Sequence, residues 1–117
     1  MSRQMTVYEK GLITVLACHA LFVALSVPLA FRKVPPNRVY GFRTPFTLSN
    51  GDRWYEVNAW FAVRFAMLSV VAALGFTGVY LFGDLAPRTY LNASIAALVA
   101  PVAISIVLTS GFIRSLR

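Results

Sequence analysis

Acidic residues are scarce in this chain of 117 residues. The four present are Glu9, Asp52, Glu56 and Asp84. Only Asp52 and Glu56 are spaced one helical turn apart, so catalysis by a carboxylate pair has a single candidate. Cysteine and histidine occur once each, as Cys18 and His19, which excludes an intramolecular disulfide and a metal cluster built from these residue types.

Motifs that carry catalysis are also missing. The sequence contains no phosphate-binding glycine loop and no nucleophile with a matching base. Cys18 lies inside an apolar run, where we interpret it as a packing residue rather than a reactive thiol. We therefore predict a protein that is not an enzyme and that carries no cofactor or metal.

Apolar residues, by contrast, make up 58% of the chain. Soluble domains contain roughly 45–50%, and a chain this short would struggle to bury the excess in a soluble core. The formal net charge is +7, which is compatible with binding to nucleic acid. The basic residues flank the apolar runs, however, a pattern typical of membrane proteins. We predict a membrane protein that does not bind nucleic acid.

Three apolar runs are long enough to cross a bilayer, which needs about 20 helical residues. We predict transmembrane helices at residues 11–31, 57–82 and 90–113. The first run could also be a secretory signal peptide, but a basic pair follows it directly and no small-residue cleavage site ends it. The prediction is an all-α membrane protein of one domain, residues 1–117, with a structured interfacial loop and helix between the first two spans.

The basic residues also predict the orientation in the membrane. The N-terminal side carries three of them, Arg3, Lys10 and Arg88. The side of loop 32–56 and the C-terminus carries seven, Arg32, Lys33, Arg38, Arg43, Arg53, Arg114 and Arg117. Because basic residues are enriched in cytoplasmic loops, we expect a multi-pass protein of the bacterial inner membrane with a cytoplasmic loop and C-terminus and an outside N-terminus.

Two ionisable residues fall within the spans. We expect His19 to face another helix and to form a hydrogen bond there, with a proton or ligand role as the alternative. Arg64 lies just below the interface, where its long side chain can extend to the headgroups or act as a functional buried charge. Trp60, four residues earlier, is placed for a cation–π contact with it. The spans also contain Pro28 and Pro101, whose freed carbonyls neighbouring helices can satisfy.

Small residues recur at helical spacing in the second and third spans. Ser69, Ala73 and Thr77 form one stripe, and Ala93 and Ala97 form another. Such stripes allow close helix packing in lipid, either within one three-helix bundle or between copies in a homo-oligomer.

Loop 32–56 breaks the apolar pattern. Two prolines hold its start extended, and Gly41 offers a position without a Cβ. Ser49 fits the N-cap of the next helix, with Asp52 reaching back to it. Arg43 presents a planar donor fork that could hold Glu56, a helix C-terminus, a lipid phosphate or a peptide partner. From these residues alone, a re-entrant or interfacial structural plug and a binding loop are equally good interpretations.

One set of residues in this region resembles the signature of the SdpI family. The seven matching positions, called the signature positions below, are Asn37, Gly41, Arg43, Thr44, Thr47, Trp54 and Asn58. The resemblance covers about residues 30–82, with a third span following. Members of that family include an immunity protein that protects bacteria against a secreted killing peptide. The resemblance therefore implies membrane immunity, and signalling through a transcriptional repressor sequestered at the membrane.

Three functions remain open at this stage. The first is an SdpI-like protein that recognises a peptide, a lipid or a membrane-protein partner through its cytoplasmic loop, with immunity to a membrane-active toxin peptide as its specific form. The second is a structural accessory subunit of a larger membrane complex. The third is a transporter or enzyme, which would require an oligomer organised around His19 and Arg64.

Overall fold

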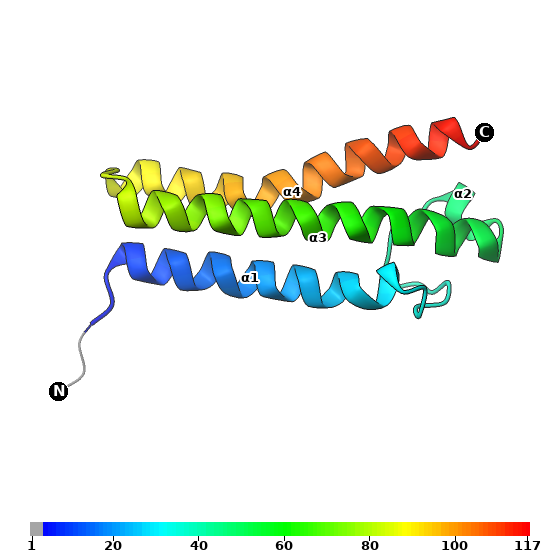
Figure 1. Ribbon diagram of the computed structural model, residues 1–117, viewed down its shortest axis with the longest axis horizontal. Helices are drawn as coiled ribbons and strands as arrows, with labels where there is room; N and C mark the ends of the chain where they lie inside the picture. Colours follow the sequence, from blue (N-terminus) through cyan, green and yellow to red (C-terminus); the bar gives the residue numbers. More distant parts are fainter. Residues whose placement is uncertain (1–3) are drawn as a thin grey trace.

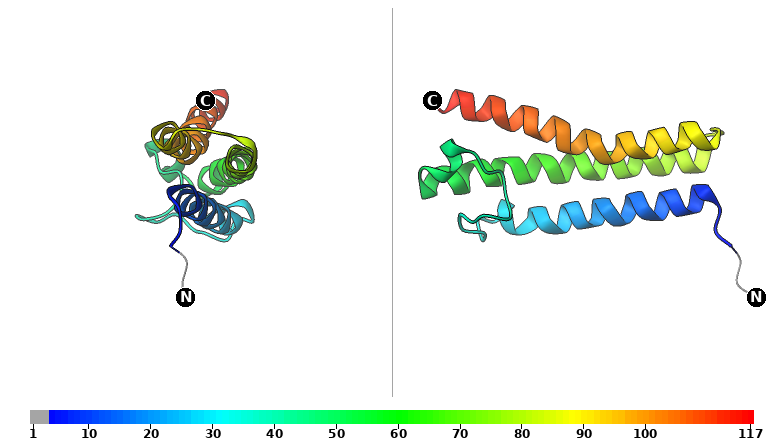
Figure 2. Two further views of the ribbon diagram at one scale, coloured as in Figure 1. Left: turned by 90° about the vertical axis from the view of Figure 1, so that its left-hand side faces the viewer. Right: turned by 180° about the vertical axis from the view of Figure 1, so that it is seen from behind.

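The computed structural model describes residues 4–117. Three long helices, α1 (Val7–Ala30), α3 (Gly51–Phe82) and α4 (Pro87–Ser115), lie side by side in alternating directions (Figure 1). A short helix, α2 (Pro45–Leu48), packs on α3. Seen end-on in Figure 2, the three long helices form a triangle in cross-section. The loop between α1 and α3 lies at the same end of the bundle as the C-terminus.

Each long helix is long and apolar enough to cross a membrane, which confirms an all-α protein with three spans. The helices are longer than the predicted spans, chiefly at their N-terminal ends, because capping rather than hydropathy sets where they begin. Thr6 caps α1 by accepting a hydrogen bond from the Glu9 N–H at 3.1 Å. Pro87 begins α4 with a φ angle already suited to a helix. Arg3, counted above on the N-terminal side, lies outside the described residues.

The start of α3 differs from the prediction. Asn50, not Ser49, is the N-cap, and its side chain accepts a hydrogen bond from the Arg53 N–H at 3.1 Å. Ser49 instead ends α2, and its hydroxyl donates to the Phe46 carbonyl at 2.7 Å. The predicted capping box of Ser49 and Asp52 is therefore wrong, because the short helix before it uses Ser49 as its own C-cap.

A hydrogen bond between α1 and α4 satisfies the carbonyl that Pro101 leaves without a donor in α4. Proline has no N–H, so it cannot donate to the carbonyl oxygen of Ala97 four residues earlier. His19 of α1 is buried, and its Nε2 lies 2.9 Å from that oxygen. A carbonyl only accepts, so this contact is a hydrogen bond in the tautomer that carries its proton on Nε2; the other ring nitrogen, Nδ1, lies 2.8 Å from the Val15 carbonyl oxygen. The prediction that His19 faces another helix and finds a partner is confirmed.

The buried hydrophobic cluster lies toward the end of the bundle opposite loop 32–56. Val15, Phe76 and Tyr90 bring together one side chain from each long helix. The Tyr90 hydroxyl donates to the Tyr8 carbonyl at 2.9 Å, and the Tyr8 hydroxyl donates to the Leu85 carbonyl at 2.8 Å. These bonds fix the turn between α3 and α4 against the start of α1.

The small-residue stripes lie partly inside this bundle. Ala93 and Ala97 of α4 pack against the buried cluster, and Ser69 of α3 is fully buried. The Thr77 hydroxyl donates to the Ala73 carbonyl at 2.7 Å, so it is satisfied within its own helix. Ala93, Ala97 and Ser69 are therefore used in packing within one chain.

Candidate functional site

The signature positions lie at one end of the bundle, in the loop after α1, in α2 and in the first turns of α3 (Figure 1). The loop begins where α1 ends, in a Schellman motif. The Lys33 N–H donates to the Pro28 carbonyl at 2.8 Å, and the Arg32 N–H donates to the Leu29 carbonyl at 3.1 Å. Arg32 takes the left-handed conformation at this motif, with φ of 58°, where glycine is the usual residue.

Asn37 organises the turn that follows. Its side-chain oxygen accepts hydrogen bonds from the Val39 and Tyr40 N–H groups at 2.9 and 2.7 Å. Its side-chain nitrogen donates to the Pro35 and Tyr40 carbonyls at 2.9 and 3.0 Å. An asparagine side chain that imitates the backbone in this way stabilises a turn without help from neighbouring elements.

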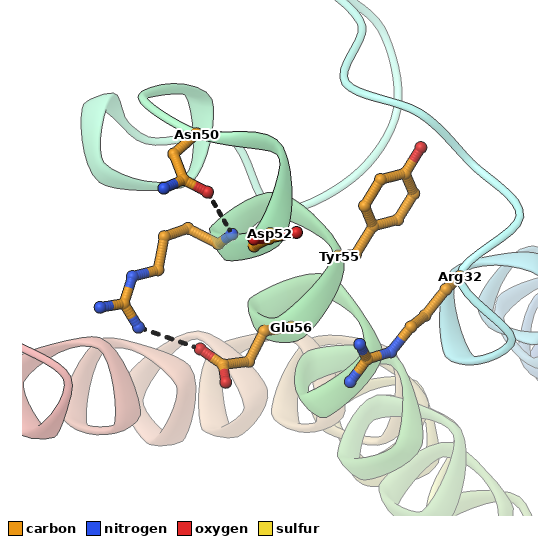
Figure 3. A pocket seen from close by; sticks show the side chains of 6 residues that line it. Arg32, Asn50, Asp52, Tyr55 and Glu56 are labelled. Carbon is orange, nitrogen blue, oxygen red and sulfur yellow. Dashed lines mark hydrogen bonds and ion pairs between the residues drawn. The ribbon is translucent and has the colours of Figure 1, made fainter.

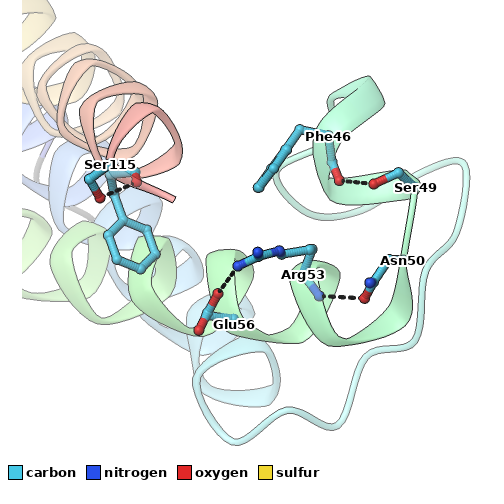
Figure 4. A network of polar contacts seen from close by, with 7 residues as sticks. Phe46, Ser49, Asn50, Arg53, Glu56 and Ser115 are labelled. Carbon is cyan, nitrogen blue, oxygen red and sulfur yellow. Dashed lines mark hydrogen bonds and ion pairs between the residues drawn. The ribbon is translucent and has the colours of Figure 1, made fainter. Parts of the chain in front are cut away.

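Arg43 is tied to the same turn. Its Nε donates to the Asn37 carbonyl at 2.8 Å, while the residue as a whole remains exposed. Of the partners considered for Arg43, Glu56 is wrong, because Glu56 pairs with Arg53 one turn away at 3.2 Å (Figure 4). The guanidinium therefore holds the loop backbone through one nitrogen and faces solvent on its outer side.

Gly41 and Asn58 join the loop to α3. Gly41 has φ of 122°, and a Cβ placed there would lie 2.9 Å from both the Asn58 Oδ1 and a ring carbon of Trp54. Asn58 Oδ1 accepts a hydrogen bond from the Phe42 N–H, and its Nδ2 donates to the Trp54 carbonyl at 3.0 Å and the Phe42 carbonyl at 3.3 Å. Only glycine allows the backbone to approach the helix this closely.

Trp54 and the two threonines complete the arrangement. The fully buried Trp54 donates from Nε1 to the Val34 carbonyl at 2.7 Å, joining α3 to the start of the loop. Thr44 caps α2 in a reciprocal box with Thr47, whose buried hydroxyl also donates to the Phe42 carbonyl at 3.0 Å. All seven signature positions therefore contribute to one folded loop, and their hydrogen bonds run mainly to backbone groups.

An open polar cleft of about 480 Å³ lies beside this loop. Arg32 approaches it from the end of α1, and the remaining lining residues belong to the N-cap and first two turns of α3 (Figure 3). They are Asn50, Asp52, Arg53, Tyr55 and Glu56. The Arg53–Glu56 pair is about 40% exposed and contributes little to stability. Arg32 and Asp52 are exposed and have no side-chain partner among residues 4–117, so the cleft presents one free charge of each sign.

A match to a known protein family identifies the family of this chain. The model of the SdpI/YfhL protein family matches residues 33–112. The chain belongs to the SdpI/YfhL family. No curated protein and no solved structure matches it. The family match contains all seven signature positions and most of the cleft, and it extends through α3 to the last turns of α4.

The two intramembrane polar residues lie apart from the cleft of this SdpI/YfhL-family chain. The Arg64 guanidinium carbon lies 4.1 Å from the centre of the Trp60 ring, so the expected cation–π contact is present. Trp60 in turn stacks on Phe112 of α4 with ring centres 4.6 Å apart. His19 contacts the Val15 and Ala97 carbonyls. His19 therefore joins α1 to α4, whereas the contacts of Arg64 run to Trp60 of its own helix, and Trp60 makes the contact with α4.

Two residues of this region were missed in the sequence. Arg32 was counted only as a flanking charge, because a positive φ at a non-glycine residue has no signature in the sequence. Tyr40 was overlooked, although its hydroxyl is buried without a hydrogen-bond partner among the described residues, and burial raises the pKa of Tyr40. The available signal was an aromatic residue in a loop next to a span, since tyrosine and tryptophan are enriched at the membrane interface.

Proposed function

We propose that this SdpI/YfhL-family protein is a non-enzymatic membrane receptor that binds a peptide or membrane-protein partner at the cleft beside loop 32–56. The observation that carries the proposal is a hydrogen-bonded loop with two unpaired charged side chains at its edge. The side chains at the signature positions form hydrogen bonds within the loop and α3, whereas Arg32 and Asp52 face the open cleft without partners among residues 4–117. A partner with a carboxylate and an amino group fits that surface.

The strain at Arg32 supports a role for its side chain. A residue with a Cβ in the left-handed conformation costs roughly 1 kcal/mol relative to glycine. Glycine would complete the Schellman motif without that cost. Arg32 gives up this stability and places a guanidinium in the cleft. Strained residues persist where their side chains serve a function.

The specific form of the proposal is immunity to a membrane-active toxin peptide, which the family resemblance implies. We also propose that the cleft faces the cytoplasm of the bacterial inner membrane, because the basic residues concentrate at that end of the bundle. A toxin peptide would then be recognised from the inner surface, or a membrane-tethered repressor would bind there.

Toxin challenge of a deletion strain tests this function. Complementation with the natural chain restores survival in the presence of the killing peptide, and the D52N and R32Q variants lower it at least tenfold because each removes one cleft charge. The matched control is R38Q, which removes an exposed charge from the same loop outside the cleft. Membrane fractions probed for each variant establish equal insertion. Equal toxin sensitivity of the deletion strain and its parent contradicts immunity.

A further inference from the structure

A second cavity, of about 390 Å³, lies between loop 32–56 and the last turns of α4. Phe42 and Thr44 line it from the loop. Four residues line it from α4, namely Ser110, Ile113, Arg114 and Arg117. None of these belongs to the charged cleft described above. The C-terminal half of α4 turns away from α3 beyond its middle, and α2 lies close to the diverging end (Figures 1 and 2).

Both charged side chains that line this cavity are positive. Arg114 and Arg117 are exposed, and neither has a carboxylate partner among residues 4–117. The Arg117 guanidinium lies 5.8 Å from the centre of the Phe46 ring in α2, which orients it toward the loop. Ser110 and Thr44 also line the cavity, and the Thr44 hydroxyl is already engaged as the cap of α2. Guanidinium groups present planar donor forks that bind phosphate oxygens.

The cavity lies at the depth of lipid headgroups. Helix α4 has 29 residues, and at about 1.5 Å per residue it is longer than the roughly 30 Å hydrocarbon core of a bilayer. Its last turns therefore reach the headgroup region when its apolar middle is centred in the membrane. Arg114, in the last turn of α4, and Arg117, just after it, then lie at the level of the phosphates of the surrounding lipids.

An apolar groove lies on α4 before the residues of the cavity, nearer the middle of the helix. It holds about 230 Å³ and is lined by Ala103, Ile104, Val107 and Leu108. Positions 103, 107, 110, 114 and 117 follow one another at spacings of four, three, four and three, so they share one face of α4. On this face the apolar residues Ala103 and Val107 precede the two arginines. This order matches a phospholipid, in which the acyl chains adjoin a charged headgroup.

We propose that this face of α4 is a binding site for one anionic phospholipid. Its phosphate contacts Arg114 and Arg117 beside loop 32–56, and an acyl chain lies in the groove at Val107. The site is separate from the cleft and does not depend on the proposed immunity function. The bound lipid would cover the open side of the loop where α4 diverges, with the contacts of the loop to α3 left unchanged.

Native mass spectrometry of the full chain tests the site. The protein is released from detergent micelles that contain either phosphatidylglycerol or phosphatidylcholine with the same acyl chains. We expect one retained phosphatidylglycerol per chain, and an apparent affinity at least tenfold lower in the R114Q/R117Q variant. The matched control is K33Q/R38Q, which removes two exposed charges from the same end of the molecule outside the cavity. Circular dichroism establishes that both variants are folded.

Four results would overturn the proposal. Equal loss of phosphatidylglycerol in both double variants would show diffuse charge attraction without a site. Equal retention in the R114Q/R117Q variant and the natural chain would place the lipid elsewhere. Equal binding of phosphatidylcholine would remove the need for a net anionic headgroup. Displacement by millimolar glycerol phosphate would identify a site for a free phosphate. If the R114Q/R117Q variant does not fold, the single variant R114Q is compared with R38Q by the same criteria.

Discussion

At the scale of single residues, the loop shows how a short sequence specifies a unique backbone path. Asn37 and Asn58 each replace several backbone partners, and Gly41 permits the contact that brings Asn58 close to the Phe42 backbone. The sequence indicated that these positions belong together through the family resemblance. It did not indicate their partners, because a side-chain amide can bond to any nearby backbone group and only the folded path selects one.

Arg32 gives the sharpest prediction at this scale. Replacement of Arg32 by glycine removes the cost of the left-handed conformation, so we expect the free energy of unfolding to rise by about 1 kcal/mol. The same change removes a cleft charge and lowers protection against a toxin peptide in the complementation assay. Thermal unfolding in detergent measures the first effect. The R32Q variant keeps the strained backbone and serves as the control, since it loses the charge without gaining stability. A drop in stability for R32G would contradict the account of strain.

At the scale of elements, the sequence predicted the three spans well, but it missed the short helix α2 and the cap that begins α3. Long apolar runs identify spans because a helix needs about 20 apolar residues to cross the hydrocarbon core of the bilayer. The helix boundary near Ser49 depends on which of several polar residues captures a free N–H, and those choices differ by about 1 kcal/mol. The break at Pro101 was expected to be satisfied by a neighbouring helix, and His19 provides that donor.

A double-mutant cycle tests the link between His19 and Pro101. In the natural chain, H19L leaves the Ala97 carbonyl without its donor, and we expect a loss of about 1–2 kcal/mol. In the P101A background, the new N–H of residue 101 can bond to that carbonyl, so H19L should cost less. The coupling free energy should be about 1 kcal/mol. Unfolding of the four proteins in denaturant and mixed micelles measures it. As a control, S94A on α4 should show no coupling to P101A, since the Ser94 hydroxyl bonds to the Leu91 carbonyl. Additive effects of H19L and P101A would exclude the bond as the cause.

At the scale of the whole molecule, the two ends of the bundle differ in chemistry. At the end with the α3–α4 turn, two tyrosine hydroxyls donate hydrogen bonds to backbone carbonyls and hold the helix ends together. The opposite end carries loop 32–56, the cleft and most of the basic residues. This polarity was predictable, since charge counts need only the order of the spans. The cleft was not, because it brings together Arg32 from the end of α1 and residues about 20 positions later.

Cysteine labelling in cells tests the orientation that follows from this polarity. Cys18 lies within α1 and is first replaced by serine, so that single cysteines can be introduced at exposed positions at each end. We expect R88C, in the first turn of α4, to react with a membrane-impermeant maleimide in intact spheroplasts. We expect R38C, in loop 32–56, to react only after the inner membrane is permeabilised, because the end with more basic residues stays in the cytoplasm. Labelling of both variants in detergent controls for access. Reaction of R38C in intact spheroplasts would reverse the orientation and would place the cleft on the outer surface, where a secreted peptide reaches it directly.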